Sequence, residues 1–299
     1  MSGMNRFGRA SSGSRRSLSC YSNAFGPGGV HAAVASLPAT GLDRLELALR
    51  PHDFGGLVIP ESAIVTERAD AATATAFVAE LARQGLVVAS ANVGGASLLD
   101  EVGVSLTERR IAFARRWFDV DLVVTTAGQP GAGWERSRVV TSLQRLGDFA
   151  AGLGVVLAVE THKGPTQNAT AMLALMSEVD RPSVGINFDT GNIAYYNEGA
   201  NPLVELERVK DWVASVHLKD NRGRQGDWYF PALGDGGAVD FRGVREILDT
   251  VGFLGPYTIE IEGVGGEPEP GLDVRVDRVR RSVDHLIACG YVPTHGKLD

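Results

Sequence analysis

Four apolar runs of strand length each end in a residue that could do chemistry, namely Glu160, Asp189, His217 and Glu260. The clearest run covers residues 155–159, which read Val-Val-Leu-Ala-Val before Glu160. A strand that is buried on both faces reads as a continuous apolar stretch, and it gains nothing by ending in a charge. These terminal residues therefore have a role other than building the strand.

The four residue types together form a set of metal ligands. In a parallel β/α barrel the carboxyl ends of all strands meet on one face, so side chains at those ends come together. Carboxylate oxygens and an imidazole nitrogen, without any thiolate, suit Mn²⁺, Mg²⁺, Co²⁺ or Zn²⁺. A lone strand-end Asp or His is more often a helix cap or a satisfied core residue, whereas four such residues at four strand ends point to a coordination site.

The elements that position these residues alternate between strand and helix along the chain. Strands are expected near residues 17–22, 41–47, 86–92, 121–126, 155–160, 184–189, 213–217 and 257–260, with helices between them and after the last. Such alternation predicts right-handed β-α-β units and a parallel sheet. Eight repeats favour closure, and no G-x-G-x-x-G turn follows the first strand, so we expect a single (β/α)8 TIM barrel.

Helix boundaries follow from local signals. Residues 105–108 have the Ser-x-x-Glu spacing of a capping box, which predicts a helix that begins there and ends near residue 118. After the strand that ends in Asp189, the next expected helix covers residues 202–209. Residues 50–70 contain two prolines and two glycines, and they are expected to form a loop on the functional face.

The chain has no linker-like change of composition between residues 17 and 291, which we interpret as one barrel domain. Residues 1–16 are rich in Ser, Gly and Arg, and they are expected to be a disordered N-terminal tail, with a transit peptide as the alternative. Residues 292–299 are expected to be a C-terminal tail. Cys20 and Cys289 are the two cysteines of the chain and form no C-x-x-C motif, which favours a reducing cytoplasm.

Composition excludes several classes of function. The chain has 299 residues, of which 44% are hydrophobic and 22% charged, so it can bury a large core. Its net charge of −7 and pI of about 5.4 give no basic field for a nucleic acid. No apolar run reaches the roughly 18–20 residues that cross a bilayer, so no membrane partner is expected.

Five motifs, in their order along the chain, resemble the xylose isomerase-like TIM-barrel superfamily: residues 159–162 (Val-Glu-Thr-His), 187–192 (Asn-Phe-Asp-Thr-Gly-Asn), 216–220 (Val-His-Leu-Lys-Asp), 230–236 (Phe-Pro-Ala-Leu-Gly-Asp-Gly) and 259–263 (Ile-Glu-Ile-Glu-Gly). The resemblance covers roughly residues 155–265. The bacterial sugar phosphate isomerase/epimerase family is the nearest part of it, and inosose dehydratases, ketose 3-epimerases and endonuclease IV are more distant members.

The resemblance implies that Glu160, Asp189, His217 and Glu260 bind one divalent metal ion, with Mn²⁺ favoured. It also implies a catalytic role for Glu160 and Glu260, one of which removes a proton next to a carbonyl while the other delivers or manages one. Glu262 shares a strand face with Glu260 and is the alternative ligand or a residue of the outer shell.

Five further residues are expected to bind substrate: His162, Asn192, Lys219, Arg222 and Trp228. His162 follows Glu160 by two residues, and a solvent-facing loop histidine is an equally good explanation. Asn192 could instead cap a turn, and Lys219 and Arg222 could belong to a surface turn. Trp228 begins an aromatic cluster that either walls a sugar site or packs over the barrel mouth.

The predicted function is a divalent-metal-dependent sugar or polyol isomerase or epimerase that works through an enediolate. A close alternative is an inosose dehydratase or a 3-oxo-glycoside lyase on the same metal site. An endonuclease IV-like enzyme is disfavoured, because that family has histidine where this chain has Asn192 and a later Asp-x-His where residues 227–229 read Asp-Trp-Tyr. A sugar-binding barrel without catalysis is the remaining alternative. The expected partner is a small sugar or polyol, and a homodimer is one option.

Overall fold

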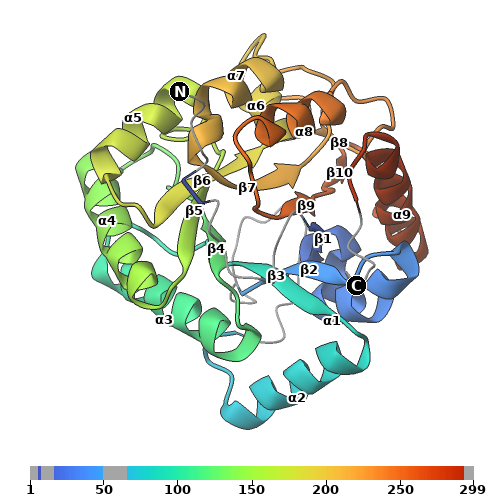
Figure 1. Ribbon diagram of the computed structural model, residues 1–299, viewed down its shortest axis with the longest axis horizontal. Helices are drawn as coiled ribbons and strands as arrows, with labels where there is room; N and C mark the ends of the chain where they lie inside the picture. Colours follow the sequence, from blue (N-terminus) through green and yellow to red (C-terminus); the bar gives the residue numbers. More distant parts are fainter. Residues whose placement is uncertain (1–5, 8–16, 50–65, 293–299) are drawn as a thin grey trace.

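Strands that are apolar along most of their length form the centre of the molecule. The computed structural model describes residues 6–7, 17–49 and 66–292. Eight parallel strands close into a barrel in sequence order, as Figure 1 shows: β1 (Leu18–Tyr21), β2 (Arg44–Ala48), β3 (Val87–Asn92), β4 (Leu122–Thr125), β5 (Val156–Glu160), β6 (Val184–Asp189), β7 (Val213–Leu218) and β9 (Tyr257–Ile259). The predicted (β/α)8 TIM barrel is thereby confirmed.

The first strand closes the barrel. Cys20 of β1 pairs with Leu45 of β2, while Leu18 pairs with Tyr257 of β9 on the other side. All residues of β6 and β7 are buried, as expected for strands that contact side chains of the barrel interior on one face and helices on the other. The continuous apolar runs of the sequence are therefore explained by burial on both faces.

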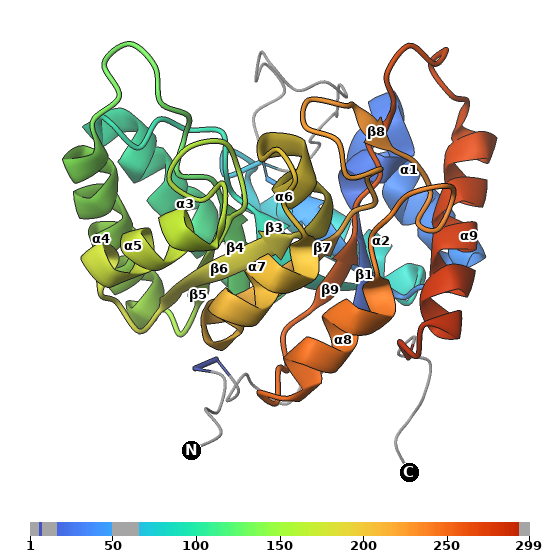
Figure 2. The ribbon, with the colours of Figure 1, turned by 90° about the horizontal axis from the view of Figure 1, so that it is seen from above.

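Helices surround the strands on all sides (Figure 1), and the side view in Figure 2 shows α6 and β8 toward one end of the barrel. The described helices are α1 (Gly29–Ser36), α2 (Ala71–Arg83), α3 (Glu101–Phe118), α4 (Arg136–Gly152), α5 (Ala169–Val179), α6 (Thr190–Tyr196), α7 (Pro202–Val209), α8 (Phe241–Asp249) and α9 (Leu272–Ala288). None of them combines the length and the apolar character that a bilayer crossing needs.

The described chain contains one α-helix more than the eight that the sequence predicts. The additional helix is α6, which begins at Thr190 directly after β6, whereas the expected helix over residues 202–209 is α7. The Asp189 carboxylate caps α6 by accepting hydrogen bonds from the backbone N–H groups of Gly191 and Asn192, at 2.9 and 3.0 Å. No loop separates β6 from α6, so the sequence shows no break to mark the helix.

The predicted start of α3 is wrong. The helix begins at Glu101 and not at Ser105, because Asp100 is its N-cap and accepts a hydrogen bond from the Gly103 N–H at 2.8 Å. Ser105 lies inside the helix, where its hydroxyl donates to Glu101 Oε1 at 2.9 Å. The Ser-x-x-Glu spacing at residues 105–108 is therefore not a capping box.

Two short strands that the sequence does not indicate form a separate antiparallel pair. β8 (Tyr229–Phe230) lies between β7 and α8 in the sequence, and it pairs with β10 (Gly263–Val264). This pairing holds the aromatic segment around Trp228 close to the chain that follows Glu260, since Gly265 N–H donates to the Trp228 carbonyl at 2.6 Å.

A small apolar cluster inside the barrel includes Leu122, Val124, Ala158 and Ala214, and Phe7 packs against it. Arg6 precedes Phe7, and its guanidinium lies 3.6 Å above the Trp212 ring.

Most of the two expected tails and most of the expected loop over residues 50–70 lie outside the described residues.

Candidate metal centre

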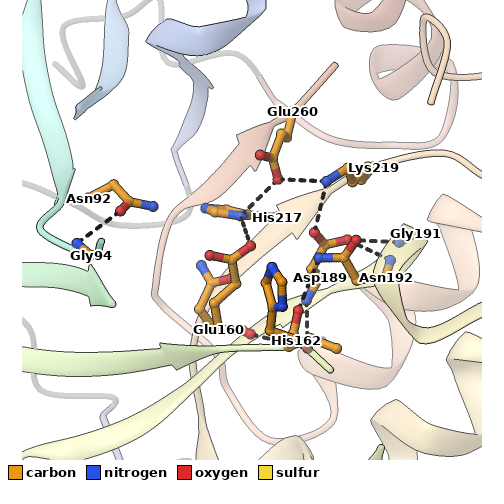
Figure 3. Close-up of polar contacts among 12 residues, drawn as sticks. Asn92, Gly94, Glu160, His162, Asp189, Gly191, Asn192, His217, Lys219 and Glu260 are labelled. Atoms are coloured by element: carbon orange, nitrogen blue, oxygen red, sulfur yellow. Dashed lines mark hydrogen bonds and ion pairs between the residues drawn. The ribbon is translucent and has the colours of Figure 1, made fainter. Parts of the chain in front are cut away.

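Side chains from four strands meet at the carboxyl end of the barrel (Figure 3). Glu160, Asp189, His217 and Glu260 each place one possible ligand atom so that all four atoms lie within 4.8 Å of one another. Asp189 and His217 are fully buried, and Glu160 and Glu260 are 8% and 4% exposed. The residues that the sequence singles out as a coordination set are thus neighbours in space.

Strand register explains this convergence. Glu160 and Asp189 are the last residues of β5 and β6, and Asp189 is the direct pairing partner of His217 on β7. Glu260 follows β9, and its backbone N–H donates to the Leu218 carbonyl at 3.0 Å. Parallel strands in register end at the same height, which places all four side chains on one level.

One nitrogen of the His217 ring points toward the cluster, and the other points toward the carboxylate of Glu46, which lies outside the cluster. Nδ1 lies 3.0 Å from Glu260 Oε2 and 3.7 Å from Glu160 Oε1, and both approaches are drawn in Figure 3. Nε2 lies 3.0 Å from Glu46 Oε1. The atom of His217 that can serve as a ligand in this cluster is therefore Nδ1.

The arrangement fits a divalent ion. His217 Nδ1 and Glu260 Oε2 are buried, yet neither atom makes a hydrogen bond within the described part of the chain, although they approach to 3.0 Å. Two neighbouring ligands of an octahedral ion at about 2.1 Å are about 3.0 Å apart. The negative charge of the three buried carboxylates is also larger than the positive charge of the one nearby lysine, Lys219, and a dication would compensate the excess negative charge. The donor set suits a hard or borderline metal.

The charges of this site depend on one another. Burial raises the pKa of Asp189 above its ordinary value, although the charge of Lys219 acts in the opposite direction. Burial also raises the pKa of Glu160, but the nearby charge of a protonated His217 outweighs it, so that this pKa is lowered. For Glu260 the attraction of Lys219 and His217 likewise overcomes burial and lowers the pKa. Positive charge at the centre therefore favours the ionised form of Glu160 and Glu260, whereas burial disfavours it at Asp189.

A cavity of about 710 Å³ opens beside the cluster, a volume typical of small-molecule sites. Among the four candidate ligands, Glu160 is the one that lines it. Aromatic and polar residues make up its wall: Gln129, Glu160, His162, Lys163, Gln167, Asn192, Tyr195, Tyr196, Lys219, Gln225, Gly226, Trp228 and Glu262. The cluster therefore has access to a ligand of sugar size.

The model of one protein family, the xylose isomerase-like TIM barrel, matches residues 36–288 of this sequence. The chain belongs to this family. The match covers most of the barrel, including the N-terminal half, where the sequence motifs gave no indication.

Several known proteins are similar to this xylose isomerase-like barrel. The inosose dehydratase of Lacticaseibacillus casei is 31% identical over 145 residues, which are 43% of this chain and 47% of that protein. The inosose dehydratase of Geobacillus thermodenitrificans is 27% identical over 220 residues, 67% of each chain. The first of these matches thus spans about half the length of the relative. The D-allulose 3-epimerase from Methylomonas sp. has the same fold, with a TM-score of 0.68, 19% identity and coverage of 92% of this chain and 98% of that one.

Four of the five residues predicted to bind substrate line the cavity beside the cluster, namely His162, Asn192, Lys219 and Trp228. The fifth, Arg222, is not among the lining residues. Its guanidinium donates to both carboxylate oxygens of Asp227, at 2.9 and 2.8 Å, and its side chain is 43% exposed. The geometry therefore does not bring Arg222 to the cavity.

Neighbouring side chains fix the orientation of the predicted residues at the cavity. Nε2 of His162 lies 3.3 Å from the Tyr196 hydroxyl, and its Nδ1 lies 3.2 Å from Gln129 Nε2. Asn192 donates through Nδ2 to the Thr161 carbonyl at 3.0 Å. These bonds hold the imidazole and the amide in place before any ligand enters.

Lys219 is held by three carboxylates. Its Nζ lies 2.6 Å from Glu262 Oε2 and 3.5 Å from both Asp189 Oδ2 and Glu260 Oε2. Burial opposes the charge of Lys219, but the three acids outweigh it and raise its pKa well above the ordinary value. The side chain is therefore a fixed cation between the metal cluster and the cavity, and Glu262 acts beside the cluster and not within it.

Proposed function

We propose that this chain is a metal-dependent dehydratase that removes water from a cyclic polyol ketone of the inosose class. The observation that carries the proposal is the similarity to inosose dehydratases, one of which aligns over 67% of both chains. The four clustered ligands and the adjacent cavity support it, because the reaction needs a polarised carbonyl and a base at one place.

A dication held by Glu160, Asp189, His217 and Glu260 would polarise the carbonyl of the substrate and make the neighbouring C–H bond more acidic. We assign removal of this proton to Glu160, because it belongs to the cluster and also lines the cavity. Glu160 then returns the proton to the departing β-hydroxyl. A C–H bond and a C–O bond break, a C=C bond forms, and one water molecule leaves.

Other residues of the cavity bind the substrate in this proposal. Lys219 contacts the oxygen that becomes negative as the proton is removed, because its ammonium group is fixed beside the cluster. His162 and Asn192 contact hydroxyl groups, and Trp228 packs against the C–H face of the ring. The position of each side chain on the cavity wall supports these proposed roles.

The charges on the wall favour a neutral polyol over a sugar phosphate. Among the described residues that line the cavity, the lysines are Lys163 and Lys219, and Lys219 is already paired with Glu262 at 2.6 Å. Phosphate recognition in proteins usually relies on arginine forks or a cradle of backbone N–H groups. Arg222, which could supply such a fork, is paired with Asp227 instead.

An isomerase or epimerase is the second candidate, and the observation that favours it is the presence of two glutamates, Glu160 and Glu260, in one cluster. Carboxylates on opposite sides of a carbon could remove a proton from one face and return it to the other. This reaction shares its first step with dehydration, but its second step returns a proton to carbon and expels no water.

Product analysis in D₂O separates the two candidates. Protein loaded with Mn²⁺ is incubated with an inosose, with keto- and aldo-sugars and with 3-oxo-glycosides, and products are followed by absorbance and mass spectrometry. We expect the inosose to lose water and to give a conjugated or dicarbonyl product that absorbs in the ultraviolet. EDTA should abolish this reaction, and added Mn²⁺ should restore it.

The variant Glu160→Gln tests the assigned base, and Glu198→Gln is its control, because Glu198 is exposed and does not line the cavity. We expect Glu160→Gln to remove turnover and Glu198→Gln to retain it. Carbon-bound deuterium in a sugar without loss of water would favour the epimerase. A metal-loaded protein that neither dehydrates nor exchanges any of these compounds would overturn the proposal.

A further inference from the structure

Buried polar contacts continue beyond the metal cluster on the far side of His217. Nε2 of His217 lies 3.0 Å from Glu46 Oε1, and the other oxygen of Glu46 accepts a hydrogen bond from Ser90 Oγ at 2.7 Å. All three side chains are fully buried. Glu46 lies on β2 and His217 on β7, and β1 and β9 lie between these strands in the sheet, so the contact crosses the barrel interior.

This contact determines which nitrogen of His217 can bind a metal. A carboxylate can only accept a hydrogen bond from the ring, so Nε2 carries the proton. In the neutral ring, which is the form that binds a metal, the lone pair is then on Nδ1, which points to Glu160 and Glu260. The Tyr21 ring stacks on the imidazole, with the ring centres 5.9 Å apart and an angle of 22° between the planes, and this limits rotation of the ring.

A second contact of the same kind orients Glu260. Asn23 Nδ2 donates to Glu260 Oε1 at 3.1 Å, so this oxygen is engaged and Oε2 is left toward His217 Nδ1. Asn23 belongs to the 3-10 helix that follows β1, and it is 6% exposed. Two of the four candidate ligands are thus oriented by residues from the first quarter of the chain.

We propose that Glu46 and Asn23 are positioning residues of the metal centre, which hold His217 and Glu260 with Nδ1 and Oε2 directed at the ion. Outer-shell carboxylates of this type fix the imidazole tautomer and increase its basicity as a ligand. The inference rests on the metal centre of the proposed function and not on its reaction.

Metal affinity is the direct test. Calorimetric titration of MnCl₂ into the metal-free full chain is compared for wild type, Glu46→Gln and Asn23→Ala. Glu46→Gln keeps the size of the side chain and removes its charge, and we expect Mn²⁺ to bind roughly 10–100-fold more weakly. For Asn23→Ala, which removes one neutral hydrogen bond, we expect a loss of about tenfold.

A spectroscopic measurement separates positioning from a merely structural role. In protein loaded with diamagnetic Zn²⁺, the Nε2–H proton of His217 should resonate far downfield, because it is hydrogen-bonded to a carboxylate. In Glu46→Gln the acceptor is neutral, and we expect the resonance to move upfield. An unchanged resonance would contradict the contact between Glu46 and His217.

Glu67→Gln is the matched control, because the Glu67 side chain is 2% exposed, pairs with the buried Arg110 at 3.3 Å and is not one of the candidate ligands. It should bind Mn²⁺ as wild type does.

If Glu46→Gln does not fold, Ser90→Ala takes its place, because it removes a hydrogen bond to the same carboxylate. We expect its Mn²⁺ affinity to fall by roughly threefold to tenfold. Wild-type affinity in the folded variant, or an equal loss in Glu67→Gln, would overturn the inference. A protein that binds Mn²⁺ as expected but has no dehydratase activity would refute only the proposed function.

Discussion

Asp189→Asn separates metal binding from folding, because Asp189 has one role in each. Its Oδ1 caps α6 through the backbone N–H groups of Gly191 and Asn192, while Oδ2 lies 3.5 Å from Lys219 Nζ at the cluster. Asparagine is as good an N-cap as aspartate, so the helix keeps its cap. The substitution removes only the charge and one anionic ligand.

The expected magnitude follows from mass action. With Mn²⁺ at 100 times its Kd, the wild-type protein is stabilised by about 2.7 kcal/mol. Loss of an anionic ligand should cost at least as much affinity as loss of an outer-shell partner, and with a 100-fold loss the stabilisation falls to about 0.4 kcal/mol. At roughly 2–4 °C per kcal/mol, Mn²⁺ should raise the Tm of the wild type by about 5–10 °C and that of the variant by about 1 °C.

The metal-free variant should remain folded. Burial disfavours the charge of Asp189, so a neutral side chain removes a desolvation cost, while Lys219 keeps Glu260 and Glu262 as partners. We therefore expect a change in unfolding free energy below the roughly 3–5 kcal/mol of an unpaired buried charge.

Differential scanning calorimetry in EDTA and in MnCl₂ measures both effects. Asp70→Asn is the control, because Asp70 caps α2 through the Thr73 N–H at 2.8 Å and is not among the candidate metal ligands. Its Tm should rise with Mn²⁺ as much as that of the wild type. An equal rise in Asp189→Asn, or no rise in the wild type, would refute the reasoning.

Three further predictions concern other parts of the barrel. Gly103→Ala should destabilise the protein by about 1–3 kcal/mol in denaturant titrations, because the added Cβ would lie 1.9 Å from a backbone oxygen. Gly152→Ala is the control, since its Cβ would enter open space, and it should stabilise the protein by about 0.4–1 kcal/mol. A stabilised Gly103→Ala would contradict the packing around Gly103. Cys20 is buried, and burial raises the pKa of its thiol, so iodoacetamide at pH 8 should reach Cys20 only after unfolding. The half-buried Cys289 should be modified in the native protein. Mass spectrometry identifies the labelled residue, and labelling of native Cys20 would argue against this prediction. Trp228→Ala should raise KM for the inosose by up to about tenfold with little change in kcat, and an unchanged KM would exclude ring packing on this side chain.

The barrel and its four clustered side chains were predictable because the signal is local. Each candidate ligand stands at the end of an apolar run, and parallel strands in register bring those ends to one level. Asp189, for example, needed only its position after residues 184–188 and the expectation that its strand pairs with that of His217.

Contacts between distant segments could not be predicted in the same way. Glu46 lies inside an apolar strand and contacts His217, which is 171 residues further along the chain, so no local spacing indicates the pair. The prediction of the first residue of α3 was wrong for a different reason. Ser105 has the right neighbours in sequence, but Asp100 has extended backbone angles that place its carboxylate on the Gly103 N–H, and it therefore caps the helix.

The most direct test of a metal centre in this barrel is a crystal structure of the full chain grown with MnCl₂, with anomalous scattering measured at the manganese edge. We predict one strong anomalous peak within bonding distance of Glu160, Asp189, Nδ1 of His217 and Glu260. Absence of a peak there at saturating Mn²⁺, or a peak bound by other residues, would contradict the central claim.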